Sequence, residues 1–213
     1  MAKFGKGDKM IEQPVPVEDL QKPESERETK PLFKLDLGCG QNKMEGFTGV
    51  DFAACDGVDI VHDLRETPWP FDSDSVDEAR AIHFYEHLCG KGRVMFMNEL
   101  WRVLKVGAGC IIATPAPFSE RFFQDWTHKW PPVVGPSFYY FNQPWLKANK
   151  LLHGDYLDAK CNFDFQVTQH FDPGFQQRSE DFRMFAGRHY VNSLTDLTTL
   201  VIKKPMPEEE PDA

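Results

Sequence analysis

Three short apolar runs, each closed by glycine or aspartate, constrain the fold of this chain more than any other feature. They are LFKLDLG at 32–38, FTGVDFA at 47–53 and VDIVHDL at 58–64. Runs of this length and composition predict buried strands. A fourth strand is predicted to end near Ile82 and His83. A fifth, GCIIATP at 109–115, must end at Pro115, which cannot continue a hydrogen-bonded ladder.

The remaining segments add a helix and a C-terminal pair of strands. A helix is predicted from about Lys91 to Lys105, where apolar residues recur at helical spacing. NFDFQVTQHF alternates strictly, which is typical of a half-exposed strand. SEDFRMFAGRHY predicts a short helix capped by Ser179, and LTTLVIKK at 197–204 a last strand. This order predicts a mostly parallel α/β architecture with an antiparallel element at the C-terminal end.

Composition limits the possible partners and compartments. The net charge of −9 argues against a nucleic-acid partner, because binding phosphates needs a basic face. No segment reaches the roughly 18 consecutive apolar residues of a membrane span, and we expect a cytoplasmic protein with no membrane partner. The five cysteines show no C-x-x-C pair, so no metal site is expected. The oligomeric state is not predicted.

Both ends of the chain differ in composition from the segment between them. Residues 1–30 are polar and proline-containing, and we expect a mobile segment there. Residues 206–213 form an acidic tail. A single domain is therefore predicted for residues 31–205.

The ends of the first three predicted strands carry the residues of a nucleoside pocket. Ligands of open parallel sheets bind outside the carboxyl ends of the strands. Gly38 and Gly40 would let the backbone approach a ligand, Asp51 could accept from a ribose diol, and Asp63 from an adenine amine. The alternative, that the two glycines serve only a tight turn, stays open because a lone G-x-G is weak evidence.

The spacing disfavours NAD as the adenosine-containing ligand. The dinucleotide fingerprint needs a third glycine, where this chain has Lys43, and an acidic residue about 20 positions further on. The segment between Gly40 and Asp51 is too short for a full helix, so a pyrophosphate would lack the helix N-terminus that binds it. S-adenosylmethionine carries no phosphate and fits this arrangement better.

The segment from Leu35 to about Pro115 resembles the class I S-adenosylmethionine-dependent methyltransferases, in particular the group called type 11. The resemblance runs, in family order, through LDLGCG, GFTGVD, VDIVHDL, PWPFDSDSVDEARAIHFYEHL and MNELWRVLKVGAG. It implies a Rossmann-like sheet of seven strands in the order 3-2-1-4-5-7-6, with strand 7 antiparallel and helices on both faces. One departure is visible: the first helix of the common fold is reduced to a turn at 41–46.

The resemblance also implies the contacts of the donor. Asp36, Gly38 and Gly40 would line its methionine and ribose portion, and Asp51 would meet the ribose hydroxyls. The remaining predicted cofactor-binding residues are Phe52, packed on the adenine, Asp63 and Leu64 at its edge, and His83 at the end of the fourth strand.

An aromatic-rich insertion follows the fifth strand and is the predicted acceptor lid, at 118–150. Ten aromatic residues lie between 118 and 145, with Asp125, His128 and Lys129 among them. A small satellite core is the alternative, although long ordered insertions are usually functional. QDWTHKW resembles a segment of family relatives after strand 5, so Asp125 and His128 are candidate acceptor contacts. His128 is the candidate general base, Asp125 would orient it, and Glu86 is a further catalytic candidate.

The function predicted from these residues is S-adenosylmethionine-dependent transfer of a methyl group to a small-molecule or glycan hydroxyl or amine. A nucleic-acid amino-methyltransferase is disfavoured because HFYEHL lacks the D/N-P-P-Y motif. The alternative is a protein that binds the donor, or consumes it, without methyl transfer.

Overall fold

The computed structural model describes residues 31–208 as one sheet with helices. The strands are β1 (Lys34–Leu37), β2 (Thr48–Asp51), β3 (Ile60–Val61), β4 (Val76–Ile82), β5 (Leu104–Pro115), β6 (Phe163–Phe171) and β7 (Leu194–Lys203). The α-helices are α1 (Gly90–Val103), α2 (Glu120–Phe123), α3 (Gln143–Ala148), α4 (Pro173–Gln176) and α5 (Glu180–His189). Short 3₁₀ turns are η3 (Tyr85–His87), η4 (Gly135–Phe141) and η5 (Gly154–Asp158). The predicted mobile segment at 1–30 and the end of the predicted acidic tail lie outside the described residues.

The strand order is β3-β2-β1-β4-β5-β7-β6, which confirms the predicted topology. β1 to β5 pair in parallel, and β7 pairs antiparallel with both β5 and β6. The largest differences from the predicted boundaries are in β3 and β5. β3 is only two residues long, and β5 begins at Leu104, because Gly107 takes a φ of +85° within a bulge and lets the strand continue where the sequence predicted a helix end.

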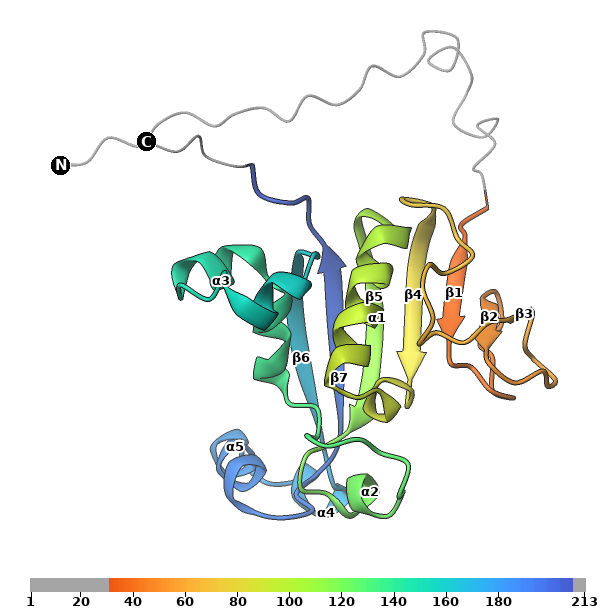
Figure 1. The fold of residues 1–213 in the computed structure, drawn as a ribbon. Helices are drawn as coiled ribbons and strands as arrows, with labels where there is room; N and C mark the ends of the chain where they lie inside the picture. Colours follow the sequence, from red (N-terminus) through yellow and green to blue (C-terminus); the bar gives the residue numbers. More distant parts are fainter. Residues whose placement is uncertain (1–30, 209–213) are drawn as a thin grey trace, which may run out of the picture. The chain divides into compact units, whose positions relative to one another are not determined.

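One face of the sheet carries the core. Leu35, Ala79, Cys110 and Val201 from adjacent strands are all buried there and belong to one hydrophobic cluster. Helix α1 covers this face with Phe96, Met97, Leu100 and Val103, which are fully buried. Figure 1 shows α1 and α3 against the same face, while α2, α4 and α5 lie beyond the carboxyl ends of β4 and β5.

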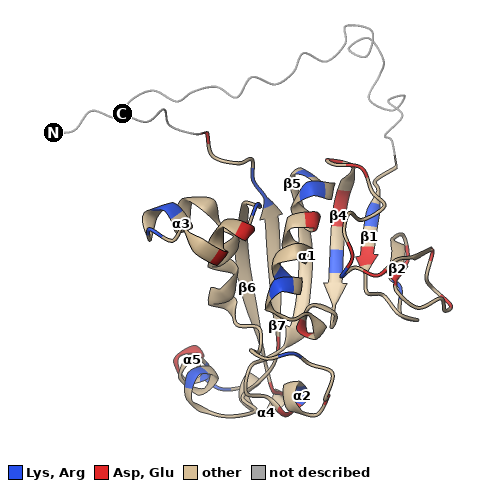
Figure 2. Cartoon of the chain, viewed as in Figure 1, with Lys and Arg blue, Asp and Glu red and all other residues tan. Residues whose placement is uncertain are grey.

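The opposite face differs from the expected second helical layer. It carries Ile111, which is 39% exposed, and charged cross-strand pairs on β1 and β4, where both charge colours are visible (Figure 2). Lys34 pairs with Glu78 at 2.6 Å, and Arg80 lies 3.4 Å from Asp36. The β1–β2 and β2–β3 connections are too short to hold a helix, so neither of them supplies one to this face.

The described helices are all short. Among residues 31–208 none has the length and apolar character that crossing a bilayer demands. The longest, α1, spans Gly90–Val103.

Candidate functional site

The carboxyl ends of β1, β2 and β4 border a cavity of about 500 Å³. Its lining residues are Gly38, Asp51, Phe52, Asp63, Leu64, Arg65, His83, Phe84, His87, Leu88, Thr127 and Lys129. Six of the predicted cofactor-binding residues are in this set: Gly38, Asp51, Phe52, Asp63, Leu64 and His83. Asp36 and Gly40 do not line the cavity and act through their neighbours.

Position 38 requires glycine, both for its backbone conformation and because of the atoms around it. Its φ is +72°, and a β-carbon at this position would lie 2.4 to 2.8 Å from atoms of the Phe84 side chain. Its N–H donates to the carbonyl of Val50 at 2.8 Å, which ties the turn to β2. The missing side chain therefore leaves room for Phe84 and brings bare backbone to the cavity.

Asp51 links the glycine turn to the end of β2. Its Oδ2 accepts from the Gly40 N–H at 3.0 Å, and its Oδ1 accepts from the Ala53 N–H at 3.2 Å. A carboxylate has about four lone-pair positions, so Asp51 can still accept from two hydroxyl groups in the cavity. Gly40 thus contributes to the site by holding this carboxylate in place.

Asp36 has a structural position rather than the predicted place in the cavity lining. Its side chain is 3% exposed and its Oδ2 accepts from the Met44 N–H at 2.8 Å. The partly buried Arg80 lies beside its other oxygen. Because the β1–β2 connection contains no helix, this carboxylate supplies a partner for a backbone N–H of the turn.

Phe52, Asp63 and Arg65 form the outer wall of the cavity. Arg65 holds Asp63 through Nε at 2.8 Å and Nη2 at 2.6 Å, and its guanidinium lies 5.8 Å from the centre of the Phe52 ring. The hydrogen bonds from Arg65 lower the pKa of Asp63, which keeps the carboxyl charged. Phe52 is 66% exposed, so its ring is available to a flat ligand.

His83 follows β4 in a left-handed conformation, with a φ of +55°. Such a conformation is uncommon for residues other than glycine and clusters at functional sites. Its Nδ1 lies 3.3 Å from Oε1 of Glu86, and its Nε2 lies 3.8 Å from Asp196. The hydrogen bond with Glu86 raises the pKa of His83, and its burial opposes that effect only in part.

The three predicted catalytic residues lie near one another beside the cavity. Glu86 is 1% exposed, and its Oε1 lies 4.0 Å from Nε2 of His128, which is 6% exposed. His128 donates from Nδ1 to the carbonyl of Phe122 at 2.7 Å. Asp125 instead accepts from the N–H and hydroxyl of Thr127, at 2.8 and 2.6 Å. The hydrogen bond that orients His128 is therefore the one to the Phe122 carbonyl, and Asp125 lies 3.7 Å from Nε2 of His128.

A backbone network positions His128 beside Glu86. The Lys129 N–H donates to the Glu86 carbonyl at 2.9 Å. Arg93, on α1, donates to the carbonyls of Pro131 and Lys129 at 2.8 and 3.2 Å. This network brings His87, Thr127 and Lys129 to the cavity, none of which was a predicted catalytic or cofactor-binding residue. The sequence signals for them were indirect: His87 is adjacent to Glu86 in HFYEHL, and Thr127 and Lys129 are adjacent to His128 in QDWTHKW.

The predicted lid divides between core and surface. Phe122, Phe138 and Phe141 are buried, and Phe138 and Phe141 belong to the main hydrophobic cluster rather than to a separate satellite core. Trp126 and Trp130, which flank His128 in the chain, are 91% and 70% exposed. Both indole rings are therefore open to a ligand or partner.

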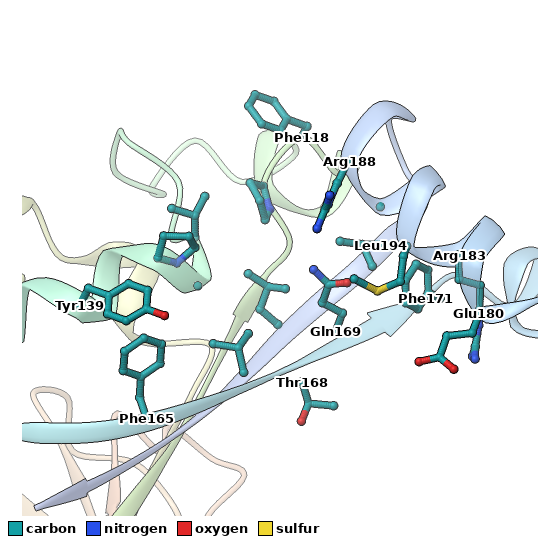
Figure 3. Close-up of a pocket in the computed structure, with 18 residues that line it drawn as sticks. Phe118, Tyr139, Phe165, Thr168, Gln169, Phe171, Glu180, Arg183, Arg188 and Leu194 are labelled. Carbon is teal, nitrogen blue, oxygen red and sulfur yellow. The ribbon is translucent and has the colours of Figure 1, made fainter. Parts of the chain in front are cut away.

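A second cavity, of about 990 Å³, lies between η4, β6 and α5. Its wall is mostly apolar, and Arg183 and Arg188 reach it from α5, as Figure 3 shows. Phe118 and Tyr139 of the predicted lid line it as well. It shares no lining residue with the first cavity, so it does not adjoin Asp51 or His83 through a common wall.

Comparisons with known proteins give likeness in structure but none in sequence. No family model and no curated protein matches the sequence. A methyltransferase from Archaeoglobus fulgidus described as SAM-dependent matches with a TM-score of 0.56 and 20% identity, over 81% of this chain and 86% of that one. The 1,6-didemethyltoxoflavin-N1-methyltransferase of Burkholderia thailandensis, solved with bound 1,6-didemethyltoxoflavin and S-adenosylhomocysteine, matches with a TM-score of 0.50 and 11% identity, over 83% of this chain and 72% of that one.

These structural similarities and the strand order define the fold class of this chain. The chain has the class I S-adenosylmethionine-dependent methyltransferase fold, as its motifs predicted. At these identities the comparison establishes the fold, and any activity has to be argued from the site itself.

Proposed function

We propose that this protein is an S-adenosylmethionine-dependent methyltransferase that acts on a hydroxyl or amine of a small molecule or glycan. The observation that carries the proposal is the cavity of about 500 Å³ in which Gly38, Asp51 and His83 meet. Ligand pockets of this kind range from about 300 to 1,000 Å³. In open α/β sheets this edge is also where ligands bind.

The cavity offers matching groups for each part of the donor. The free lone pairs of Asp51 accept from the ribose hydroxyls, and the exposed Phe52 ring packs on the adenine. In this proposal Asp63 meets the edge of the adenine, although Arg65 already donates to both of its oxygens. An adenine amine must therefore share that carboxylate with Arg65 or displace it.

Methyl transfer from this donor depends mainly on alignment. A bond forms between the acceptor oxygen or nitrogen and the methyl carbon while the carbon–sulfur bond breaks. Its electron pair stays on sulfur, and S-adenosylhomocysteine is the leaving group. Holding acceptor, methyl and sulfur in line accounts for most of the rate enhancement. The acceptor proton passes to a base, for which His128 Nε2 is the candidate because Nδ1 is committed to the Phe122 carbonyl.

The acceptor approaches, in this proposal, from the side of His87, Thr127 and Lys129. The exposed rings of Trp126 and Trp130 supply flat apolar surface near that side. A sugar or another ring compound fits such a surface better than a polyanion does, given the net charge of −9.

A labelled-donor experiment tests the proposal. The full-length protein is incubated with methyl-labelled S-adenosylmethionine and a fractionated mixture of metabolites and glycans. We expect S-adenosylhomocysteine and a labelled product in equal amounts. Consumption of the donor without a labelled product would support the alternative of a donor-consuming protein, and no consumption with any fraction would leave a binding module.

A further inference from the structure

We propose that Glu86, His87 and His128 form a binding site for a divalent transition-metal cation. One ligand atom from each of these residues lies within 4.8 Å of the other two. Two imidazoles and one carboxylate are a donor set that zinc and ferrous iron use in proteins. The site borders the proposed donor cavity through His87, and its role in binding an acceptor rests on the proposed function.

The hydrogen bonds of His128 leave one ring nitrogen for a cation. The Phe122 carbonyl can only accept, so Nδ1 of His128 carries the proton in their 2.7 Å contact. Nε2 of a neutral imidazole then has a free lone pair, and this nitrogen is the one that lies 4.0 Å from Glu86 Oε1. Metal-binding histidines commonly donate their other N–H to a carbonyl or carboxylate in this way.

The hydrogen bonds of His87 have the same consequence. The Thr127 hydroxyl donates its single proton to Asp125 at 2.6 Å. It must therefore accept from Nδ1 of His87 in their 2.9 Å contact, which leaves Nε2 of His87 with a free lone pair. Asp125 thus supports His87 through Thr127, a role different from the one that the sequence predicted for it.

Glu86 supplies the third ligand and the charge. Its side chain is 1% exposed, and its Oε2 is buried without a hydrogen-bond partner among the described residues. An unpaired carboxylate oxygen in the interior is costly unless a cation or a donor meets it. Oε1 is the oxygen that faces His128, so a divalent cation bound by both carboxylate oxygens of Glu86 would also give Oε2 its missing partner.

The geometry requires only a small closure. A tetrahedral cation with bonds of about 2.1 Å holds its ligand atoms about 3.4 Å apart. A separation of 4.8 Å therefore has to shorten by about 1.4 Å and the 4.0 Å between Glu86 and His128 by about 0.6 Å, which side-chain rotations can supply. Three protein ligands leave at least one position open, as in catalytic zinc sites. That position would take an oxygen of the methyl acceptor, and His128 would then be a ligand rather than the general base.

Metal titration of the full-length protein tests the site without any need for activity. The protein is stripped with a chelator and titrated with Mn²⁺, with unbound Mn²⁺ followed by electron paramagnetic resonance. Zn²⁺ content is measured in parallel by elemental analysis after desalting. We expect one equivalent of cation in the wild type. The substitutions Glu86→Gln, His87→Gln and His128→Gln should each weaken binding roughly tenfold or more.

The exposed His170 on β6 provides the matched control, since His170→Gln removes an imidazole far along the chain from the cluster. Melting curves verify that each variant is folded. The proposal is overturned if the wild type binds neither cation, or if the three cluster variants bind as tightly as His170→Gln. Calorimetry with S-adenosylhomocysteine in the absence of metal separates the two proposals. A wild-type protein that binds S-adenosylhomocysteine but no metal contradicts only the metal site.

Discussion

Nε2 of His128 lies 4.0 Å from Oε1 of Glu86, although 41 positions in the chain separate the two residues. His128 belongs to the segment after β5 and Glu86 to η3 after β4. The hydrogen bond from the Lys129 N–H to the Glu86 carbonyl holds the two segments together. This contact brings His87 of η3 and Thr127 of the segment after β5 to the wall of the same cavity.

Replacing Asp51 should weaken donor binding. Asp51→Ala removes the acceptors for the ribose hydroxyls, and donor affinity should fall roughly tenfold or more, equivalent to about 1–3 kcal/mol. The loss of the bonds to Gly40 and Ala53 should lower the melting temperature slightly as well. Calorimetry with S-adenosylhomocysteine measures the affinity, and Asp56→Ala in the following exposed loop is the control. Equal affinities for the two variants would refute the ribose assignment.

The two glycines of the turn should differ in their tolerance of alanine. Gly38→Ala combines a positive φ with a clash against Phe84, and should destabilise the fold by about 2 kcal/mol or more. Gly40→Ala also has a positive φ, of +49°, but meets open space, and should cost about 1–2 kcal/mol. Urea unfolding of both variants gives the comparison. A Gly40 variant less stable than the Gly38 variant would contradict this reading of the turn.

Removing His128 should separate transfer from donor binding. His128→Gln should reduce methyl transfer by roughly 10²- to 10⁴-fold, whether the imidazole acts as a base or as a metal ligand. Donor affinity should change by only a few tenths of a kcal/mol, because His128 does not line the donor cavity. Unchanged turnover would make His128 a structural residue, and lost donor binding would place it in the donor site. His170→Gln is again the control.

Stability at low pH should depend on Glu99. Burial raises the pKa of Glu99, but hydrogen bonds from Arg102 and the Trp69 N–H outweigh it and lower the pKa below the ordinary value of 4.5. A carboxyl with a lowered folded-state pKa stabilises the fold above its unfolded-state pKa, and this contribution is lost as the pH falls through the folded-state pKa. The stability difference between wild type and Glu99→Gln should therefore be largest near neutral pH and shrink below about pH 4.5. Urea titrations at several pH values check this, and a difference that grows on acidification would contradict it.

Much of the fold was predictable because its strands are local features. LDLGCG and GFTGVD carry both the apolar runs and the residues that end them, so the strands and the positions of Gly38 and Asp51 follow from short segments. The order of the strands in the sheet was predicted from the resemblance to the class I methyltransferases. The bulge in β5 was not predictable, since Gly107 reads as a helix stop until the register with β4 is known. The exposure of the second sheet face was equally hard to predict, because it depends on which connections between strands lack helices.

The site was predictable at the strand ends and much less so elsewhere. Gly38, Asp51 and His83 end strands, and parallel strands place their ends together. His87, Thr127 and Lys129 reach the cavity only through contacts between η3 and the segment after β5. Asp36 looked like a ligand residue, but its oxygens are taken by Met44 and Arg80. Such competition among local partners is a property of the folded chain.

Calorimetry tests directly whether this protein binds S-adenosylmethionine. The full-length protein is titrated with S-adenosylmethionine, S-adenosylhomocysteine and, as a comparison, NAD, and its melting temperature is recorded with each. We expect one site for the first two ligands, with a stabilisation of about 2.7 kcal/mol when the ligand is at 100 times its Kd, and no comparable effect of NAD. Absence of both heat and melting shift at millimolar S-adenosylmethionine, or equal binding of NAD, would contradict this expectation.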